Sequence, residues 1–408
     1  MKHAIGMALC AMVLGSTSVA SKQPEKGGGP FCAGLNKAVA PLTGEADAVF
    51  IRSYEPGAGE ANLPAGIATT AFVYDNALAV IALIACGNVP DAKPIGNALS
   101  RAARNDRTFH DHRVRNAYRA GPVGNGAPNL PGWWDEHARI WAEDAAQDGT
   151  STGNVAWAAL ALLTLHQATH DRQYLNDARS LIDWVIATTA CGDGFCGGVH
   201  GYDPQQVTLT WMSTEHNADV HAAASWLLRL TSEPKYADAA GQARRLLDRS
   251  FRGNHFLLGT KPDGSLADEG LLALDAQLWP WMAVPDAPAA WRSTLDFAQT
   301  HLAVDGGFDF NGDRDGVWVE GTAQAALAYR ISGDTPRSDR LLVNLKADQT
   351  RSGLLNAART ARLTTGLSID PTGTVPDFFY YRRPHLGATA WAALAEAGWN
   401  PFTGEKIR

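Results

Sequence analysis

The chain has 408 residues and 45% of them are hydrophobic, which is enough to fill the core of one large domain or of two. A formal net charge of −7 gives no electrostatic attraction toward a polyanion, so we do not expect nucleic acid as a partner. The 13 Trp residues are a high number, and aromatic side chains of this kind favour a concave binding surface.

The first 20 residues have the pattern of a secretory signal peptide. A basic start is followed by an apolar run at 4–14 and by the small residues Ser18-Val19-Ala20. This run is too short for a membrane anchor, and no later run is both long enough and uncharged enough to cross a bilayer. We therefore expect a secreted or periplasmic protein without a membrane span, with a flexible linker at 21–30 and a single folded domain at 31–408.

Four of the five Cys residues lie beyond the signal peptide, and an even number in an oxidising compartment favours disulfides. Cys191 and Cys196 are spaced to close a tight loop. That pairing leaves Cys32 and Cys86 to tie the N-terminal arm to the first long helix. Zinc is the alternative, but no His is grouped with these Cys residues at metal-ligand spacing, so we favour disulfides.

Apolar, alanine-rich helices alternate with amphipathic helices along the chain. The apolar helices are expected at 72–85, 154–166, 215–230, 272–284, 320–331 and 386–397. The amphipathic helices are expected at 92–104, 173–188, 234–251, 287–302 and 335–345. Short strands are predicted in the long connections at 197–211 and 255–266.

The starts of the apolar helices are similar to one another, which indicates an internal repeat. Five of them align, at 74–79, 153–158, 215–219, 320–325 and 385–390, and the fourth helix, at 270–281, is the least regular. A single helical hairpin cannot bury its apolar face, so six hairpins of about 60 residues must stack in sequence. We expect an all-α ring of inner and outer helices, with short β-hairpins in the loops, in which all inner helices begin at one functional face.

Three acidic residues stand at the starts of alternate inner helices: Asp75, Glu215 and Glu320. Asp75 lies in an apolar stretch, where an ionised carboxylate is costly without partners, so we interpret it as a base or a substrate ligand. Glu320 follows Trp318, which in a cleft would raise the pKa of the carboxyl group by desolvation, as a general acid requires. Glu215, one turn from the charge of Asp219, competes for the same role, and a purely structural place at the positive end of the helix dipole is its alternative.

Polar residues beside these acids are candidates for binding a substrate. They are His216 and Asn217, which follow Glu215, Asp219 one turn away, and Gln324 one turn after Glu320. For His216 and Asn217, hydrogen bonds to loop carbonyls are an equally good interpretation.

Aromatic side chains in the loops of this face can stack on the apolar faces of sugar rings. The candidates are Trp133, Trp134, Trp211, Trp318, Tyr380 and Tyr381, and some of these are expected to be ordinary packing. Arg382 and His385 follow directly and can bind an acidic sugar. Contacts to nearby carboxylates explain these two residues equally well.

The segment at 309–316 matches the first half of a calcium loop. Oxygen-bearing side chains recur at every second position, at Asp309, Asn311, Asp313 and Asp315. If Asp309 is the first ligand, the required Gly falls on Arg314, and if Asn311 is the first, no acid stands at the twelfth position. Because the match is partial, we favour a solvated acidic turn over a calcium site and expect no other cofactor.

Three motifs together resemble the six-hairpin glycosidase superfamily, whose members are (α/α)6 toroids. They are Ser-Thr-Glu-His-Asn at 213–217, Glu-Gly-Thr-Ala-Gln at 320–324, and the closing His-Leu-Gly-Ala-Thr-Ala-Trp at 385–391 with Asn-Pro-Phe at 400–402. The resemblance extends over nearly the whole mature chain. It implies that a glycan binds across the N-terminal ends of the inner helices and is cleaved by two acidic residues.

We therefore predict an exported, monomeric glycoside hydrolase that cleaves a polysaccharide or oligosaccharide with paired carboxyl groups. A polysaccharide lyase is the alternative enzyme, with Tyr380, His385 or His216 as a base. A toroidal epimerase would act on a cytosolic monosaccharide, which the signal peptide argues against. Outside catalysis, the alternative is a toroid that only binds glycans.

Overall fold

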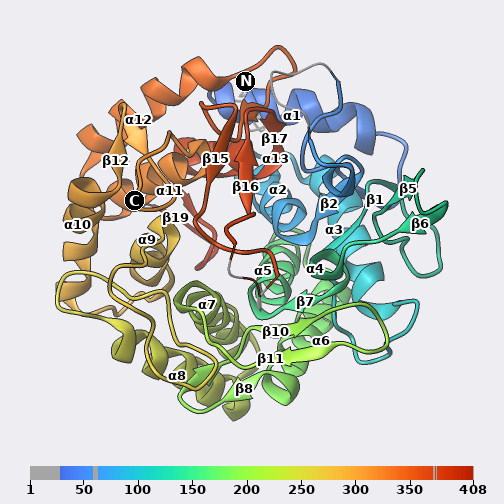
Figure 1. Ribbon diagram of the computed structural model, residues 1–408, viewed down its shortest axis with the longest axis horizontal. Coiled ribbons are helices and arrows are strands. Elements are labelled where there is room, and N and C mark those ends of the chain that lie inside the picture. The colour runs from blue at the N-terminus through green and yellow to red at the C-terminus, as the bar shows by residue number, and fades with distance from the viewer. Residues whose placement is uncertain (1–27, 58–62, 371–372, 374, 408) are drawn as a thin grey trace, which may run out of the picture.

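The computed structural model describes residues 28–57, 63–370, 373 and 375–407. Within them, the inner helices form a closed ring in which each contacts the next: α2 (Val73–Ala85), α5 (Thr152–Thr169), α7 (Thr214–Thr231), α9 (Leu274–Ala283), α11 (Val319–Ile331) and α13 (Leu386–Ala397), which packs back on α2 (Figure 1). The outer helices are α1 (Pro30–Thr43), α3 (Val89–Arg104), α6 (Arg172–Thr188), α8 (Pro234–Ser250), α10 (Ser293–His301) and α12 (Thr335–Leu345). The expected (α/α)6 toroid is confirmed.

Helix α1 is an outer helix that the sequence analysis did not predict. It packs against α13, and the Glu396 carboxylate of α13 accepts hydrogen bonds from the backbone N–H groups of Phe31 (3.1 Å) and Cys32 (3.0 Å) at its first turn. The disulfide between Cys32 and Cys86 joins it to the end of α2, and the disulfide between Cys191 and Cys196 is also present, as predicted. The first segment of the domain therefore closes the ring onto the last helix. The expected signal peptide and residues 21–27 of the expected linker lie outside the described residues.

The strands are short and antiparallel, and they lie in the loops together with one single-turn helix, α4 (Ala145–Asp148). The two-stranded pairs are β1 (Val49–Phe50) with β4 (Gly121–Pro122), β2 (Thr70–Phe72) with β3 (Ala117–Arg119), β5 (Trp133–Asp135) with β6 (Ile140–Ala142), β8 (Ala190–Cys191) with β9 (Gly194–Phe195), β12 (Ala303–Val304) with β13 (Gly307–Phe308), β14 (Leu355–Asn356) with β17 (Pro384–His385), β15 (Arg362–Thr364) with β16 (Phe379–Tyr381), and β18 (Trp399–Asn400) with β19 (Glu405–Lys406). Strand β10 (Gly198–His200) lies between β7 (Thr150–Ser151) and β11 (Val207–Leu209), which confirms strands within 197–211. The expected strands at 255–266 are reduced to the isolated bridges Phe251–Phe256 and Thr260–Leu266.

Most residues of the inner helices are apolar on every side of the helix, and this pattern allows the helices to be buried on all sides. Large aromatic side chains pack against one another inside the ring: the ring of Trp157 on α5 lies 5.4 Å from that of Trp279 on α9, 5.7 Å from that of Trp391 on α13 and 5.1 Å from that of Phe402, which lies between β18 and β19. The centre of the toroid is therefore a packed aromatic core, and a ligand can bind only at an end of the ring. In the described part of the chain, none of the helices combines the length and the apolar character that a bilayer crossing requires.

A polar residue at the fourth position of five inner helices fixes the loop that precedes the helix. Asn76, Asn217 and Gln277 each accept from one backbone N–H and donate to the C=O of the same residue, at 2.8–3.0 Å; the partners are Ile51, Phe195 and Phe256. Thr322 and Thr389 accept from the N–H groups of Phe308 and Leu355 in the same way. These bonds set the rotation of the first turn and thereby decide which side chain at positions two and three faces the mouth of the ring. Asn217, a predicted substrate ligand, is buried and has this structural task.

Candidate active site

The first turns of the inner helices bring acidic groups together at one end of the ring. The second residues of the neighbouring helices α7, α9 and α11 are Glu215, Asp275 and Glu320, and Asp75 is the third residue of α2. The positive end of a helix dipole stabilises each carboxylate, while the carboxylates repel one another. Asp275 escaped the sequence analysis because the fourth helix is irregular. The signal was Gln277, which stands two residues after Asp275 as Asn217 stands two residues after Glu215.

Asp75, Glu320 and His385 form a first, buried cluster, which we call the histidine cluster. The imidazole Nε2 of His385 lies 3.3 Å from Asp75 Oδ2, and its Nδ1, which accepts the Ala388 N–H at 3.2 Å, lies 3.6 Å from Glu320 Oε2. The Tyr74 hydroxyl donates to Glu320 Oε1 at 2.8 Å. Glu320 Oε2 is buried and receives no hydrogen bond from any described residue. One oxygen of Glu320 is thus held in place and the other has unused acceptor capacity.

In the histidine cluster, burial and the neighbouring charges have opposite effects on the pKa of His385, and several opposing effects set the pKa of Glu320. Burial raises the pKa of Glu320 to about 7, with a contribution from the charge of Asp75, against the lowering effects of His385 and the Tyr74 hydrogen bond. Burial lowers the pKa of His385, but the carboxylates of Asp75 and Glu320 outweigh it, so that the pKa is raised overall. Near neutral pH, Glu320 therefore exchanges a proton readily, which suits an acid or a base.

Glu215, Asp219 and Asp275 form a second cluster, which we call the carboxyl cluster. Burial, the charge of Asp275 and a hydrogen bond shared with Asp275 raise the pKa of Glu215 well above its usual range, and Asp219 adds to the effect. The Asp219 carboxyl is 1% exposed, and its pKa is also raised by burial and then by Asp275. The Glu215 side chain is 30% exposed. Of this cluster, Glu215 is therefore the carboxyl group that a substrate can reach, and its raised pKa favours the protonated form.

Two glycines leave room for the side chains of these clusters. A Cβ added at Gly387 would lie 2.3 Å from Asp75 Oδ1 and 3.0 Å from Glu320 Oε2. A Cβ added at Gly153 would lie 2.4 Å from His216 Cδ2 and 3.1 Å from Asp219 Oδ2. Both glycines are the second residues of their helices, α13 and α5, where other inner helices carry an acid.

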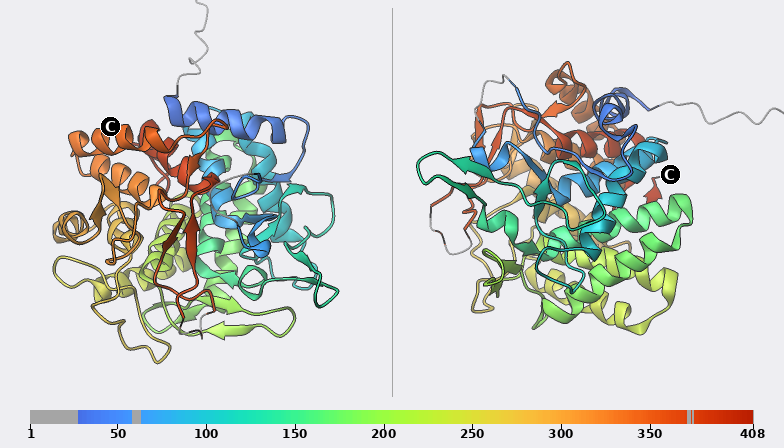
Figure 2. Two further views of the ribbon diagram at one scale, coloured as in Figure 1. Left: turned by 45° about the horizontal axis from the view of Figure 1, so that its top comes forward. Right: turned by 90° about the vertical axis from the view of Figure 1, so that its right-hand side faces the viewer.

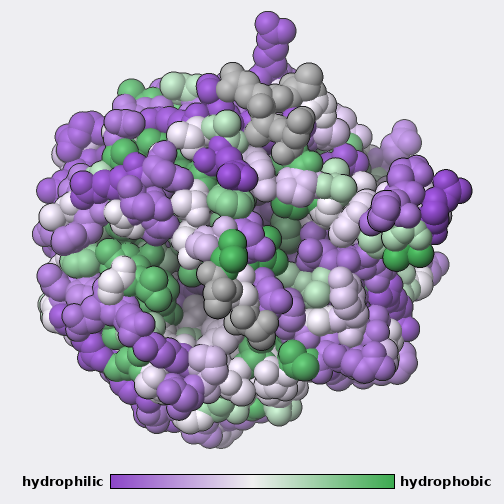
Figure 3. Space-filling model, in the orientation of Figure 1, coloured by the Kyte–Doolittle hydropathy of each residue, from purple (hydrophilic) through white to green (hydrophobic). Residues whose placement is uncertain are grey.

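A cavity of about 430 Å³ opens beside the carboxyl cluster. Its wall includes Glu215, Trp211, Leu258, Lys261, Phe310 and Leu367. Figure 3 shows the surface hollowed near the centre of the ring on this face. A wall that is mostly apolar, with an acid and an aromatic side chain at the rim, suits a sugar, whose ring has apolar faces and polar edges.

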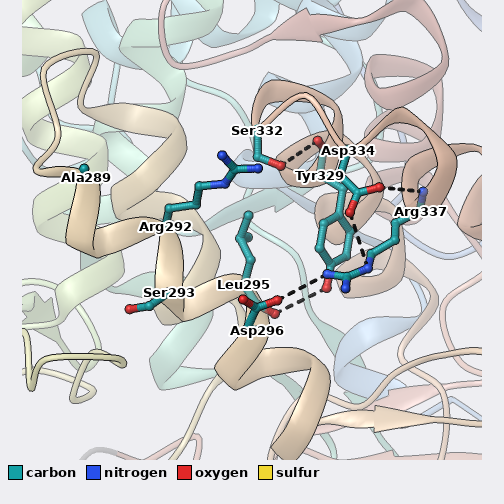
Figure 4. A pocket seen from close by; sticks show the side chains of 9 residues that line it. All are labelled: Ala289, Arg292, Ser293, Leu295, Asp296, Tyr329, Ser332, Asp334 and Arg337. Carbon is teal, nitrogen blue, oxygen red and sulfur yellow. Dashed lines mark hydrogen bonds and ion pairs between the residues drawn. The ribbon is translucent and has the colours of Figure 1, made fainter.

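A second cavity, of about 450 Å³, lies on the outer side of the toroid between α10, α11 and α12 (Figure 4). Arg337 crosses it, with its guanidinium 3.3 Å from Asp296 Oδ1 and 3.3 Å from Asp334 Oδ2. None of the acids at the inner-helix starts lines it. Its charged groups neutralise one another, so we place the candidate site at the first cavity.

The predicted aromatic residues divide into three groups. Trp211 lines the first cavity, with its ring 5.7 Å from that of His216, and Tyr380 lies over the histidine cluster, 6.3 Å from the ring of His385. Trp318 and Tyr381 are buried, at 1% and 8% exposure, so they belong to the candidates that serve as ordinary packing. Trp133 and Trp134 lie in the β5–β6 hairpin at the periphery of the ring, away from both clusters (Figures 1 and 2).

The remaining predicted ligands differ in burial and in distance from the two clusters. His216 Nε2 lies 3.9 Å from Glu215 Oε1, and burial lowers the pKa of His216 to about 4, so it is neutral beside the cavity. Gln324 is fully buried and accepts from the Trp279 indole N–H at 2.9 Å, which gives it a packing role. Arg382 is exposed at the turn between β16 and β17. His385 contacts the carboxylates of Asp75 and Glu320, which is one of the two interpretations that the sequence left open.

Two groups of described residues have ligand atoms close enough to share a metal ion: the histidine cluster, and Asp309 with Asp313 and Asp315. In the first group, the imidazole of His385 lies between the two carboxylates, 3.3 Å from Asp75 and 3.6 Å from Glu320. In the second group, Asp313 and Asp315 are exposed, as expected of a solvated turn, but Asp309 is completely buried, which the sequence analysis did not predict.

The sequence matches no protein-family model and no curated protein. The structure, in contrast, is similar to many solved structures. These include an α-amylase from Clostridium perfringens (TM-score 0.62, 8% identity, 90% of this chain and 96% of that chain covered), a glycosidase (0.61, 14%, 90% and 97%), and the cellobiose 2-epimerase from Spirochaeta thermophila (0.60, 14%, 90% and 94%). At these identities the similarity concerns the fold alone. The chain therefore shares the (α/α)6 toroid fold with these solved structures, and it carries acidic groups at the starts of its inner helices.

Proposed function

We propose that this protein is an exported glycoside hydrolase that cleaves a polysaccharide or oligosaccharide at the mouth of the toroid. The observation that carries the proposal is that Glu215 lines a cavity of about 430 Å³ and that the charge of Asp275, on the helix between α7 and α11, raises the pKa of both Glu215 and Glu320. Hydrolysis of a glycosidic bond requires one carboxyl group that donates a proton and a second that activates water or attacks carbon. The similar structures named as a glycosidase and an α-amylase support this choice of chemistry.

The two clusters differ in a way that assigns the two roles. Glu215 is protonated and partly exposed, so it acts as the general acid that protonates the leaving oxygen. Asp275 shares a hydrogen bond with Glu215 and keeps its proton in place. Glu320, with one oxygen held by Tyr74 and the other without a donor, acts as the base or nucleophile. Asp75 positions His385, whose charge favours the ionised form of Glu320.

Export is part of the proposal. Two disulfides in the folded domain are typical of proteins in an oxidising compartment, and they agree with the signal peptide expected at 1–20. We further propose that the protein acts as a monomer.

The proposed function is tested by incubating the purified chain with a panel of bacterial and plant glycans and measuring the release of reducing ends. New reducing ends without ultraviolet absorbance of unsaturated sugars are expected. Absorbance that rises with cleavage would instead identify a lyase, an alternative favoured by the position of Tyr380 over His385. Binding without cleavage of any glycan would leave a glycan-binding toroid.

Replacement of Tyr74 by Phe is expected to move the acidic limb of the pH profile of kcat/KM to higher pH. The Tyr74 hydroxyl donates to Glu320 and lowers its pKa, so its loss raises a pKa that is already about 7. Because a base must be ionised, activity at pH 6 falls more than activity at pH 8, by a factor of about 3 to 10. Tyr329→Phe is the control, since the hydroxyl of Tyr329 bonds to α10 at the outer cavity, and an unshifted limb in Tyr74→Phe would contradict the role of Glu320.

Replacement of Asp275 by Asn is expected to move the basic limb of the pH profile of kcat/KM. Asp275 raises the pKa of Glu215 through its charge and its hydrogen bond, so the substitution lowers the pKa of the acid. A general acid must be protonated, and the basic limb of kcat/KM therefore moves to lower pH, by about one unit. The measurement is the full pH profile with wild type in parallel. A basic limb that stays in place would show that Glu215 is not the acid.

A further inference from the structure

The side chain of Asp309 has an unusual environment on the loop between β13 and α11. Asp309 is completely buried, and its Oδ1 accepts the N–H of Phe310 at 2.7 Å. Its Oδ2 is also buried, yet no described residue donates a hydrogen bond to it. A buried carboxylate oxygen without a donor or a cation is unfavourable, so this atom indicates a missing positive partner.

Two more carboxylates face the same point. One oxygen from each of Asp309, Asp313 and Asp315 lies within 4.8 Å of one oxygen of each of the others. Three acids at this spacing repel one another strongly in the absence of a cation.

We propose that Asp309, Asp313 and Asp315 bind a calcium ion. All three ligands are carboxylate oxygens, which a hard divalent cation prefers, and no described Cys or His shares the group, as zinc would favour. The exposed side chains of Asp313 and Asp315 leave room for the water ligands that complete a calcium shell of six to eight oxygens. All three ligands also come from one short loop, 309–315, so the chain can wrap around such an ion.

The position of the loop gives the ion a structural role beside the candidate active site. Asp315 Oδ2 accepts the N–H of Thr364 at 3.0 Å, which ties the loop to the β15–β16 hairpin that carries Tyr380. The C=O of Phe310 accepts the N–H of Leu274 at 2.8 Å, at the start of α9. Calcium at Asp309 would therefore brace the starts of α9 and α11 together with the hairpin that covers them.

The test uses the full mature chain, freed of metal with a chelator and titrated with calcium chloride by calorimetry. We expect one calcium ion to bind with a Kd of about 10⁻⁴ to 10⁻³ M. At calcium 100 times above Kd, the Tm is expected to rise by about 3 °C. Magnesium is expected to have a much weaker effect, and an equal response to both ions would overturn the assignment to calcium.

Two variants separate binding from folding. Asp309→Asn keeps the bond from the Phe310 N–H and removes the buried charge, so its Tm without calcium is expected to match or exceed that of wild type. The exposed double variant Asp313→Asn/Asp315→Asn gives an independent measurement, because exposed side chains tolerate the change. Both variants are expected to lose the calcium response by at least about tenfold in affinity, whereas Asp238→Asn, an exposed acid of α8, keeps it.

The proposal is overturned if 10 mM calcium, a concentration of about 100 times the lower Kd limit, leaves the Tm of wild type unchanged and gives no binding heat. It is also overturned if the exposed double variant keeps the full response. Neither readout requires a glycan, so the result does not depend on whether the protein hydrolyses one.

Discussion

Replacement of either Glu215 or Glu320 by Gln is expected to lower kcat/KM on the cleaved glycan by about 10³-fold. Gln has the shape of Glu but can neither donate the proton that the leaving oxygen requires nor ionise to activate water. The two helices that carry these residues, α7 and α11, both contact α9, so each loss acts at the same mouth of the ring. The measurement is the initial rate of reducing-end release over a range of substrate concentrations.

The fold of both variants is expected to be unharmed. Burial raises the pKa of both side chains, so the folded protein favours an uncharged group at each position, and Gln supplies one. Glu269→Gln, an exposed carboxyl of the loop before α9, serves as the control and is expected to retain wild-type kcat/KM and Tm. If Glu215→Gln and Glu320→Gln both cleave at the wild-type rate, the assignment of acid and base is wrong.

Replacement of Gly387 by Ala is expected to reduce activity by about 100-fold, although neither residue has a functional group. The added Cβ would lie 2.3 Å from Asp75 Oδ1, which is too close for any contact, and 3.0 Å from Glu320 Oε2. The carboxylate of Asp75 must move, and the 3.3 Å contact with His385 is lost. Both the charge balance and the position of Glu320 change as a result.

The control for this substitution is Gly241→Ala on the outer helix α8. A Cβ there meets only Arg245 Nη1 at 3.9 Å, and Ala favours helix, so activity is unchanged and stability rises by up to about 1 kcal/mol. For Gly387→Ala, kinetics and thermal unfolding are measured together. An active enzyme with wild-type kcat would show that the histidine cluster does not need its present geometry.

The ring could be predicted because its signals are local. Each inner helix is apolar all round and each outer helix has one apolar stripe, and these patterns are visible in any window of the sequence. Helix α1 was missed because its local sequence signal is weak. It follows the predicted linker, contains Pro41, and becomes the sixth outer helix only through its contacts with α13 and the Cys32–Cys86 disulfide.

The roles of single site residues were harder to predict. Asn217 and Asp219 look alike as polar residues at the start of α7, yet one is bonded to the Phe195 backbone and the other belongs to the carboxyl cluster. Trp318 precedes Glu320, as a cleft residue would, but it is buried because Tyr380 packs on it, with ring centres 5.2 Å apart. Such outcomes depend on contacts with other segments of the chain, from 22 residues away for Asn217 and Phe195 to 62 residues away for Trp318 and Tyr380.

The sequence by itself determined the repeat, the alternation of inner and outer helices and the presence of acids in the first turns, because hydrophobic period and helix starts are properties of neighbouring residues. Only the tertiary structure decided which acids meet. Glu215 meets Asp275 because the neighbouring helices α7 and α9 pack side by side, and Asp75 meets Glu320 and His385 because ring closure brings α2 against the last helices of the chain. Charge interactions and desolvation act over only a few ångströms. The pKa values of these acids, and with them the division into acid and base, are therefore set only in the closed ring.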